Sequence, residues 1–197
     1  MILALWGKSM NILVINGHPD RESFVSALFK KYADGIDKKK HAVELLDLSS
    51  MKFDPVLRFG YRKRMEPDEE IEHSQKLIQW ADHFVFFFPI WFGMIPSLLK
   101  GWFERTLTPG IAYNMKGYKV IKHLKGKTAH LVFTCQSPVI YQRITGNLEL
   151  KMVKRLLWFS GIKTVKVDRL GNTVGKYAKP ERRSKFLKRI GERAAEI

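Results

Sequence analysis

The fold is decided by the stretch His83-Phe-Val-Phe-Phe-Phe-Pro-Ile-Trp-Phe-Gly-Met-Ile-Pro-Ser-Leu-Leu-Lys-Gly-Trp-Phe-Glu-Arg105. Its apolar run from Phe84 to Phe88 lacks polar alternation, which is typical of a strand covered on both faces in a parallel sheet. Pro89 has no N–H to donate, so we expect the strand to stop there. Pro96 is a favoured first residue of a helix. The stretch predicts a central strand, an aromatic loop and a helix, although a core strand that binds nothing gives the same pattern.

Length and composition indicate one globular domain. The chain has 197 residues, enough for a single full core. We expect this domain to span residues 10–197, after an N-terminal extension over residues 1–9, because Met10 directly precedes the first strand. A single cysteine, Cys135, rules out an internal disulfide and fits a reducing, cytoplasmic compartment. The longest uncharged run, Phe84 to Leu99, contains two prolines, so we do not expect a transmembrane protein.

The formal charge of +16 is high. It raises the hypothesis of a nucleic acid or an anionic membrane as partner. The basic residues are spread over several segments, with the densest block between Lys176 and Arg193, and no dedicated nucleic-acid motif accompanies them. We interpret the charge as a solvated basic surface, and an anionic partner stays open as the alternative.

Apolar strands and amphipathic helices alternate along the chain. The pattern predicts five strands, at residues 11–15, 41–46, 84–88, 127–134 and 162–167, and helices at 22–35, 68–82, 96–106, 149–160 and 180–195. Two long connections, over residues 47–70 and 107–126, separate some of them. This alternation predicts an α/β fold with a doubly wound, five-stranded parallel sheet in the flavodoxin-like order 2-1-3-4-5.

Three loops would then meet at the carboxyl edge of the sheet. The first leads into a helix N-terminus with Ser23 and Phe24, where free N–H groups and the helix dipole favour a phosphate. His18 could add to this site or be an ordinary loop histidine. The second loop, Ile90 to Gly93, offers aromatic bulk and backbone amides to a flat ring. The third supplies polar groups, and its Cys135 is best interpreted as a buried, inert thiol.

No other catalytic or metal-binding pattern is present in the sequence. The six histidines have no metal-ligand spacing, so we expect no metal site. The chain has no Gly-rich dinucleotide fingerprint, P-loop or nucleophile elbow. An enzyme of this kind would leave the chemistry to a cofactor.

Three motifs stand out along the chain: Gly17-His18-Pro19 with Ser23-Phe24, the stretch Phe88 to Gly93 that runs into Pro96 to Arg105, and Thr108-Pro-Gly-Ile-Ala-Tyr113. Through them the chain resembles the NAD(P)H:quinone oxidoreductase family of flavodoxin-like flavoproteins, which includes bacterial modulators of drug activity and ancillary oxidoreductases of potassium efflux systems. The likeness spans about Asn11 to Glu192.

The resemblance implies a non-covalent flavin, either FMN or FAD. His18, Ser23, Phe24 and Val25 would hold its phosphate. The isoalloxazine ring would lie against the second loop, with ring and amide contacts, and against the third, through Pro89, Ile90, Trp91, Phe92, Thr134, Cys135, Gln136 and Ser137.

The family likeness also implies a homodimer with its active sites at the interface, where Tyr113 and Met115 would belong to the substrate pocket near the partner's flavin. NAD(P)H would give hydride to the flavin and leave, and a quinone or another electrophile would take two electrons in a ping-pong cycle. The surplus of arginines mildly favours NADPH, with Arg58, Arg62 and Arg64 as candidates for its 2′-phosphate.

The sequence departs from the family pattern at three places. Thr134-Cys-Gln-Ser137 replaces the frequent Thr-Thr-Gly-Gly, and Val25 replaces a polar residue. Tyr141 matches the proposed relay tyrosine only with a shift of about one residue, and Asn147 is the nearest candidate for the missing histidine. Two alternatives therefore stay open, a flavodoxin-like electron carrier and a nucleic-acid-binding or regulatory partner module, neither of which would turn over NAD(P)H.

Overall fold

The computed structural model describes residues 9–60, 62–66, 68–175 and 178–197. Except for Ser9, the expected N-terminal extension lies outside these residues. The elements, in chain order, are β1 (Asn11–Asn16), α1 (Phe24–Gly35), β2 (Ala42–Asp47), α2 (Glu69–Trp80), β3 (His83–Ile90), α3 (Ser97–Thr106), β4 (Tyr113–Lys116), β5 (Lys119–Lys122), β6 (Thr128–Cys135), α4 (Val139–Ile144), α5 (Leu148–Ser160), β7 (Lys163–Leu170) and α6 (Pro180–Ala195).

Five parallel strands form the central sheet, in the order β2-β1-β3-β6-β7. Counted within this sheet alone, the order is the expected 2-1-3-4-5. The numbering differs because β4 and β5 form a separate antiparallel hairpin. The order reverses between β1 and β3, which places the switch point of the doubly wound fold there. No helix among the described residues is long and apolar enough to span a membrane.

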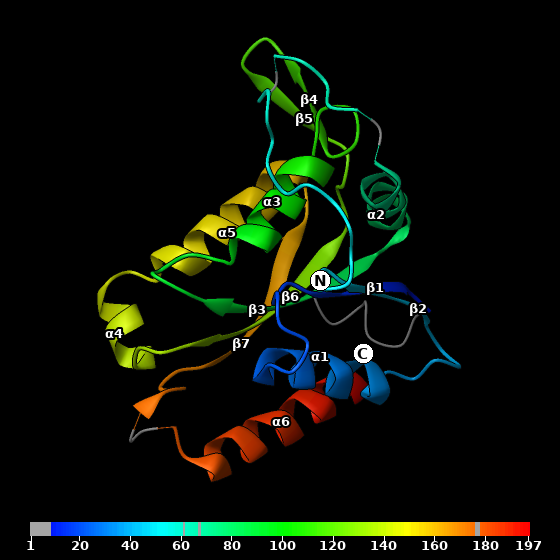
Figure 1. Ribbon diagram of the computed structural model, residues 1–197. Coiled ribbons are helices and arrows are strands. Elements are labelled where there is room, and N and C mark those ends of the chain that lie inside the picture. The colour runs from blue at the N-terminus through cyan, green and yellow to red at the C-terminus, as the bar shows by residue number, and fades with distance from the viewer. Residues whose placement is uncertain (1–8, 61, 67, 176–177) are drawn as a thin grey trace.

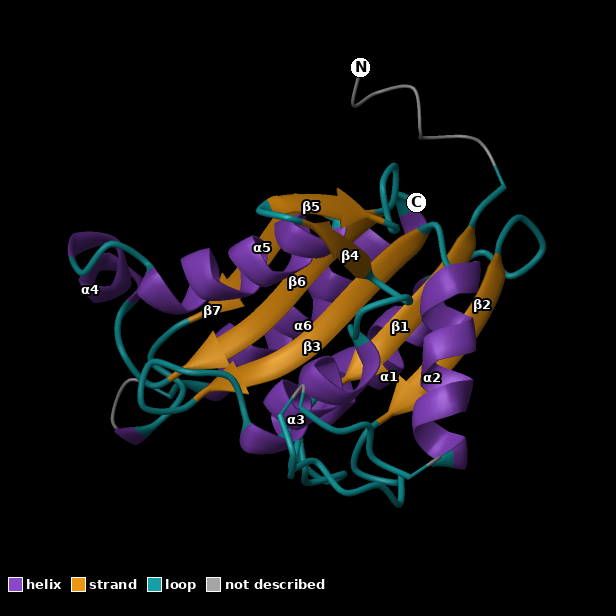
Figure 2. Ribbon diagram, turned by 90° about the horizontal axis from the view of Figure 1, so that it is seen from above, coloured by secondary structure: helices purple, strands orange, loops and turns teal. Residues whose placement is uncertain are grey.

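The sheet lies between two layers of helices. Helices α1 and α6 cover one face, and α2, α3 and α5 cover the other (Figures 1 and 2). Because side chains alternate along a strand, Ile12 and Val14 pack on the α1/α6 side whereas Leu13 and Ile15 pack on the opposite side. All eight residues of β3 are buried, so the predicted central position of this strand is confirmed.

The expectation that Pro89 ends its strand is wrong, because β3 continues to Ile90 alongside β6, where Pro89 pairs with Thr134. Alternate residues of a strand direct their N–H and C=O groups to the same side. The Phe87 carbonyl accepts from Gly17 N–H at 2.7 Å, so it points towards β1. The position of the missing N–H of Pro89 faces that side too, beyond the last β1–β3 pair, Asn16–Phe87. The proline therefore removes no hydrogen bond from the sheet.

Two elements lie where the sequence predicted only connections. The segment 107–126 contains the hairpin β4–β5, whose two-residue turn has Gly117 at a φ of +59°. The segment after β6 contains the short helix α4. The four-residue hairpin strands are mostly exposed and polar, so they lack the apolar alternation by which strands are found in a sequence.

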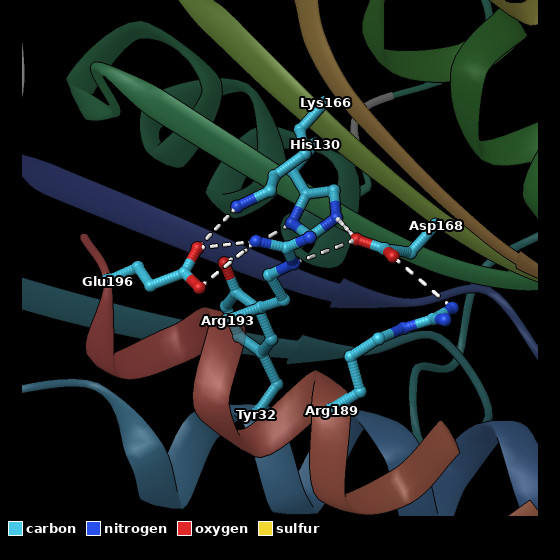
Figure 3. Close-up of polar contacts among 7 residues, drawn as sticks. All are labelled: Tyr32, His130, Lys166, Asp168, Arg189, Arg193 and Glu196. Atoms are coloured by element: carbon cyan, nitrogen blue, oxygen red, sulfur yellow. Dashed lines mark hydrogen bonds and ion pairs between the residues drawn. The ribbon is translucent and has the colours of Figure 1, made fainter. Parts of the chain in front are cut away.

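A buried polar cluster joins α6 to the sheet (Figure 3). The His130 ring lies 3.0 Å from Asp168 Oδ2 through Nε2 and 3.3 Å from the Tyr32 hydroxyl through Nδ1. Two α6 arginines, Arg189 and Arg193, approach the Asp168 carboxylate at 3.4 and 3.8 Å. The cluster fixes the packing of α6, whose first turn borders the site described next.

Candidate active site

A pocket of about 160 Å³ lies at the carboxyl edge of the sheet. Carboxyl ends of parallel strands share one edge, so loops from four strands meet there. Gly17 allows the first of these loops to lie close to α3, since a Cβ there would be 2.8 Å from the Leu99 side chain. The lining residues are His18, Ser23, Phe24, Val25, Pro89, Ile90, Trp91, Thr134, Cys135, Gln136, Thr173, Val174 and Arg183.

The N-terminus of α1 forms the polar end of the pocket. Ser23 is its N-cap, and the Ser23 hydroxyl accepts from Ser26 N–H at 3.1 Å. The preceding amides, of Phe24 and Val25, are in the first turn, where N–H groups have no intrahelical acceptor. These amides and the positive end of the helix dipole suit a phosphate, as predicted for this loop.

His18 adds a neutral hydrogen-bond donor to this end. Burial lowers its pKa, which outweighs the opposing influence of Asp20. Nδ1 of His18 accepts from Asp20 N–H at 2.9 Å, so the proton of the neutral ring is on Nε2. The ring lies edge-on to Trp91, with centroids 5.2 Å apart. His18 is therefore held in one tautomer beside both the helix N-terminus and the aromatic loop.

The sequence reasoning missed three lining residues: Thr173 and Val174 in the loop after β7, and Arg183 in the first turn of α6. Arg183 donates to the Thr173 carbonyl at 2.8 Å, and its guanidinium lies 5.6 Å from the Phe24 ring centroid. A signal was available, because Gly171-Asn-Thr-Val-Gly175 follows the last strand of a parallel sheet, and that strand must end at the same edge. Arg183 gives the polar end a permanent positive charge.

The aromatic loop differs in part from its prediction. Pro89, Ile90 and Trp91 line the pocket, and the Trp91 side chain is 40% exposed. The Trp91 amide was expected to be free for a ligand, but it donates to the Met94 carbonyl at 2.9 Å. Phe92 has a φ of +50° and a fully exposed side chain that does not line the pocket. The local turn takes up the amide because a tight Trp91–Met94 bridge forms in both directions.

The loop after β6 forms the opposite wall. Thr134, Cys135 and Gln136 line the pocket, whereas Ser137 does not. Cys135 is buried, and burial raises the pKa of its thiol. Its Sγ lies 3.6 Å from the Leu170 carbonyl. A buried thiol with a raised pKa is a poor nucleophile, which agrees with the interpretation of Cys135 as inert.

Three predicted residues are not brought to this pocket within one chain. Tyr141 is exposed on α4, and Met115 is exposed on the hairpin. Tyr113 packs edge-on against Phe159 of α5, with centroids 4.8 Å apart. The relay candidate Asn147 accepts a hydrogen bond from Arg169. None of these side chains lines the pocket.

The arginines suggested for a 2′-phosphate lie elsewhere. Arg58 pairs with Asp54 at 2.6 Å on the surface. Arg64 lines a different cavity, of about 580 Å³, together with the buried Arg105 and the carboxylate of Asp68. Neither Arg58, Arg62 nor Arg64 lines the pocket at the carboxyl edge.

Comparisons with known proteins agree with the fold and with the motifs. A family described by its flavodoxin-like fold matches residues 10–194. The structure of Smu.1420 from Streptococcus mutans is 30% identical, with a TM-score of 0.85 over 95% of this chain and 100% of that one. The mouse ribosyldihydronicotinamide dehydrogenase [quinone] is 30% identical over 62% of each chain. The guinea-pig NAD(P)H dehydrogenase [quinone] 1 is 35% identical over 51% of this chain and 44% of its own length.

The matched regions thus span about half to two-thirds of these two curated relatives. The family match, by contrast, covers nearly the whole chain. Together with the motifs at residues 17–24, 88–105 and 108–113, these matches assign the chain to a protein family. It belongs to the flavodoxin-like family that includes the NAD(P)H:quinone oxidoreductases.

Proposed function

We propose that this chain is a flavin-dependent NAD(P)H oxidoreductase that reduces a quinone or a similar electrophile by two electrons in a ping-pong cycle. The observation that carries the proposal is the pocket at the switch point, where a helix N-terminus and a half-exposed tryptophan border one space. The names of the curated relatives, which contain "NAD(P)H dehydrogenase" or "dihydronicotinamide dehydrogenase" together with "quinone", support a nicotinamide donor and a quinone acceptor. The reducing compartment suggested by the single cysteine supports a cytoplasmic location.

The residues present fit a flavin phosphate and one side of its ring. The α1 amides, the neutral N–H of His18 and the Arg183 guanidinium are all donors, so the polar end suits an anion. Trp91 and Pro89 provide an apolar wall for a flat ring. When bound, FMN or FAD supplies the redox chemistry by accepting hydride from NAD(P)H and passing two electrons on.

Pocket size supports a homodimer. Enclosed ligand sites usually measure roughly 300–1,000 Å³, whereas this pocket measures about 160 Å³. Exposed apolar side chains lie on the loop after β3, on helix α4 and at the start of α5, namely Phe92, Met94, Ile140, Tyr141, Ile144 and Leu148. A second copy that covers them would exclude water from the pocket. Across such an interface, Tyr113, Met115 or Tyr141 of one copy would be able to reach the substrate pocket of the other.

The test is the absorption spectrum of the purified protein, followed by reconstitution with FMN and with FAD. We expect a flavin spectrum, and oxidation of NADPH or NADH that depends on added menadione. Initial rates at several fixed menadione concentrations should give parallel double-reciprocal plots, as a ping-pong cycle requires.

Two results would contradict the proposal. A protein that takes up neither FMN nor FAD has no flavin site. A protein that binds flavin but does not oxidise either nicotinamide nucleotide is an electron carrier of the flavodoxin type. Size-exclusion chromatography with light scattering tests the homodimer separately, because a monomer could still bind flavin.

A further inference from the structure

Positive charge is segregated in one part of the molecule. Between Glu104 and Asp168 the sequence has twelve Lys or Arg residues and a single acidic residue, Glu149, which is buried. The basic block of α6 is different, because it contains its own acids and forms ion pairs within the helix and its C-terminal end, such as Lys188–Glu192 and Arg193–Glu196. Arg105 and Lys166, by contrast, pair with acids outside their segment. The C-terminal block, which has the densest positive charge in the sequence, is therefore not the region where positive charge is least balanced by acids.

The hairpin β4–β5 concentrates this uncompensated charge. Lys116 and Lys119 face each other directly across the hairpin, on either side of its turn. Like charges at directly opposed positions destabilise a β-ladder. Neither lysine forms an ion pair with a residue in the described part of the chain. A lysine pair in this position carries a cost in the free protein that a negatively charged partner would relieve.

Exposed apolar and aromatic side chains lie near these lysines. Tyr118 in the turn is fully exposed, and Ile121 is 40% exposed. By the alternation of the strands, Ile121 lies on the same face as Lys116 and Lys119, opposite to Tyr113 and Met115. At the base of the hairpin, the exposed Trp158 of α5 carries the Lys122 ammonium 3.2 Å from its ring centroid.

We propose that the hairpin surface, defined as Lys116, Tyr118, Lys119 and Ile121, docks onto an anionic lipid bilayer. Lysine charges attract the negative surface of such a bilayer, and tyrosine is favoured at the level of the lipid headgroups. Lys122 and Trp158 take no part in this contact, because Lys122 pairs with Tyr113 across the hairpin and so lies on the other face. The face of the hairpin that carries Tyr113 and Met115 is left for other contacts.

Two other occupants fit less well. A second copy, placed symmetrically on this surface, would bring lysines against lysines with no exposed acid from this region to balance them. A nucleic acid is usually held by arginine forks and by stacked aromatic rings, and the hairpin has lysines only. A bilayer suits this surface better, because its lysine charges lie beside one exposed tyrosine and one exposed isoleucine.

The test is co-sedimentation of the full chain with vesicles of phosphatidylcholine and phosphatidylglycerol in equal parts, compared with pure phosphatidylcholine. We expect salt-sensitive binding to the anionic vesicles alone. Each basic residue near a membrane contributes about fivefold in partitioning. The double variant Lys116→Gln/Lys119→Gln should therefore lower binding by roughly 25-fold, and Tyr118→Ala should lower it further in a way that depends little on salt.

A charge-matched control separates this surface from net charge. Lys185→Gln/Lys188→Gln removes the same charge from the exposed side of α6, on the opposite face of the sheet. Vesicle binding of that control should stay within about twofold of wild type, since distant charges are screened. Equal losses in both double variants would overturn the proposal. So would binding to a single-stranded DNA oligonucleotide without binding to the anionic vesicles.

Lys119→Glu separates docking from folding. The substitution places opposite charges across the hairpin from Lys116, so the thermal midpoint should stay the same or rise. Binding to anionic vesicles should nevertheless fall by more than the fivefold expected for one lost charge. Unchanged vesicle binding in this folded variant would overturn the proposal.

Discussion

Two regions of this molecule hold a histidine whose pKa is lowered by burial, and they differ in where their hydrogen bonds go. In the polar cluster under α6, burial lowers the pKa of His130 and raises that of Tyr32, so the neutral ring accepts from the tyrosine and donates to Asp168. Burial alone would raise the pKa of Asp168, but the His130 hydrogen bond and the nearby arginines hold it below its usual range.

In the pocket, by contrast, the donors face open space. His18 keeps its Nε2 proton and uses only Nδ1 internally, and the α1 amides have no intrahelical acceptor. The cluster has the order Tyr–His–Asp that suggests catalysis, yet Tyr32 and His130 are almost completely buried. A shifted pKa therefore does not identify the functional site here. The distinguishing feature is polar groups left unsatisfied towards a cavity.

The largest effect that would sharpen this contrast is expected from Asp168→Ala. It leaves the His130 N–H and the two arginines without their buried acceptor, so we expect a loss of about 3 kcal/mol in unfolding free energy. Flavin affinity of the folded protein should not change. Urea titration and flavin fluorescence measure the two quantities, and Asp168→Asn, which keeps an acceptor, should lose less. A stable Asp168→Ala protein that no longer binds flavin would reverse the assignment of roles.

The next largest effect is expected from acid, which should lower the free energy of unfolding by protonating buried histidines. Burial lowers the pKa of His83 on β3 to about 3, below the unfolded value of about 6.5. The neutral ring thus favours the folded state above pH 6.5, and this stability is lost as pH falls towards the folded pKa. At pH 5 the loss for His83 alone is about 2 kcal/mol. Urea titrations at pH 7 and pH 5 should show a smaller drop for His83→Gln than for wild type, and equal drops would contradict a neutral, buried His83.

Trp91→Ala tests the pocket side of the comparison. Because this side chain is half-exposed, we expect stability to change by less than about 0.5 kcal/mol. Flavin affinity should fall about tenfold through loss of ring contact, and turnover should fall with it. Fluorescence titration with FMN and FAD measures the affinity. An unchanged affinity would mean that Trp91 is no part of the cofactor site.

The smallest effects come from a matched pair of α6 arginines, each over a phenylalanine ring, Arg183 at 5.6 Å and Arg189 at 4.8 Å. Arg183→Gln should lower flavin affinity about fivefold by removing a charge from the phosphate end. Arg189→Gln should leave affinity unchanged and cost at most about 1 kcal/mol of stability, since its ion pair with Asp168 is half-exposed. Equal effects on flavin affinity would contradict the placement of Arg183, and not Arg189, at the pocket.

Much of this architecture could be predicted because it depends on local patterns. The five sheet strands lie within a few residues of their predicted positions, since apolar runs such as Phe84–Phe88 must be buried on both faces. The hairpin β4–β5 was missed because its short strands are exposed and are stabilised by packing such as Tyr113 on Phe159. Arg183 was missed because it is almost a hundred residues from Pro89, so only the folded sheet brings them to one pocket.

The sequence by itself determined the fold class, the switch point and the capped helix N-terminus after the first strand, because strand burial, turn residues and helix caps are properties of neighbouring residues. Only the tertiary structure decided which of the candidate groups are available to a ligand. It shows that the Trp91 amide is used by Met94, that Phe92 points away, and that two lysines oppose each other across the hairpin. Hydrogen-bond satisfaction and charge apposition depend on distances between residues far apart in the chain, which no local pattern specifies.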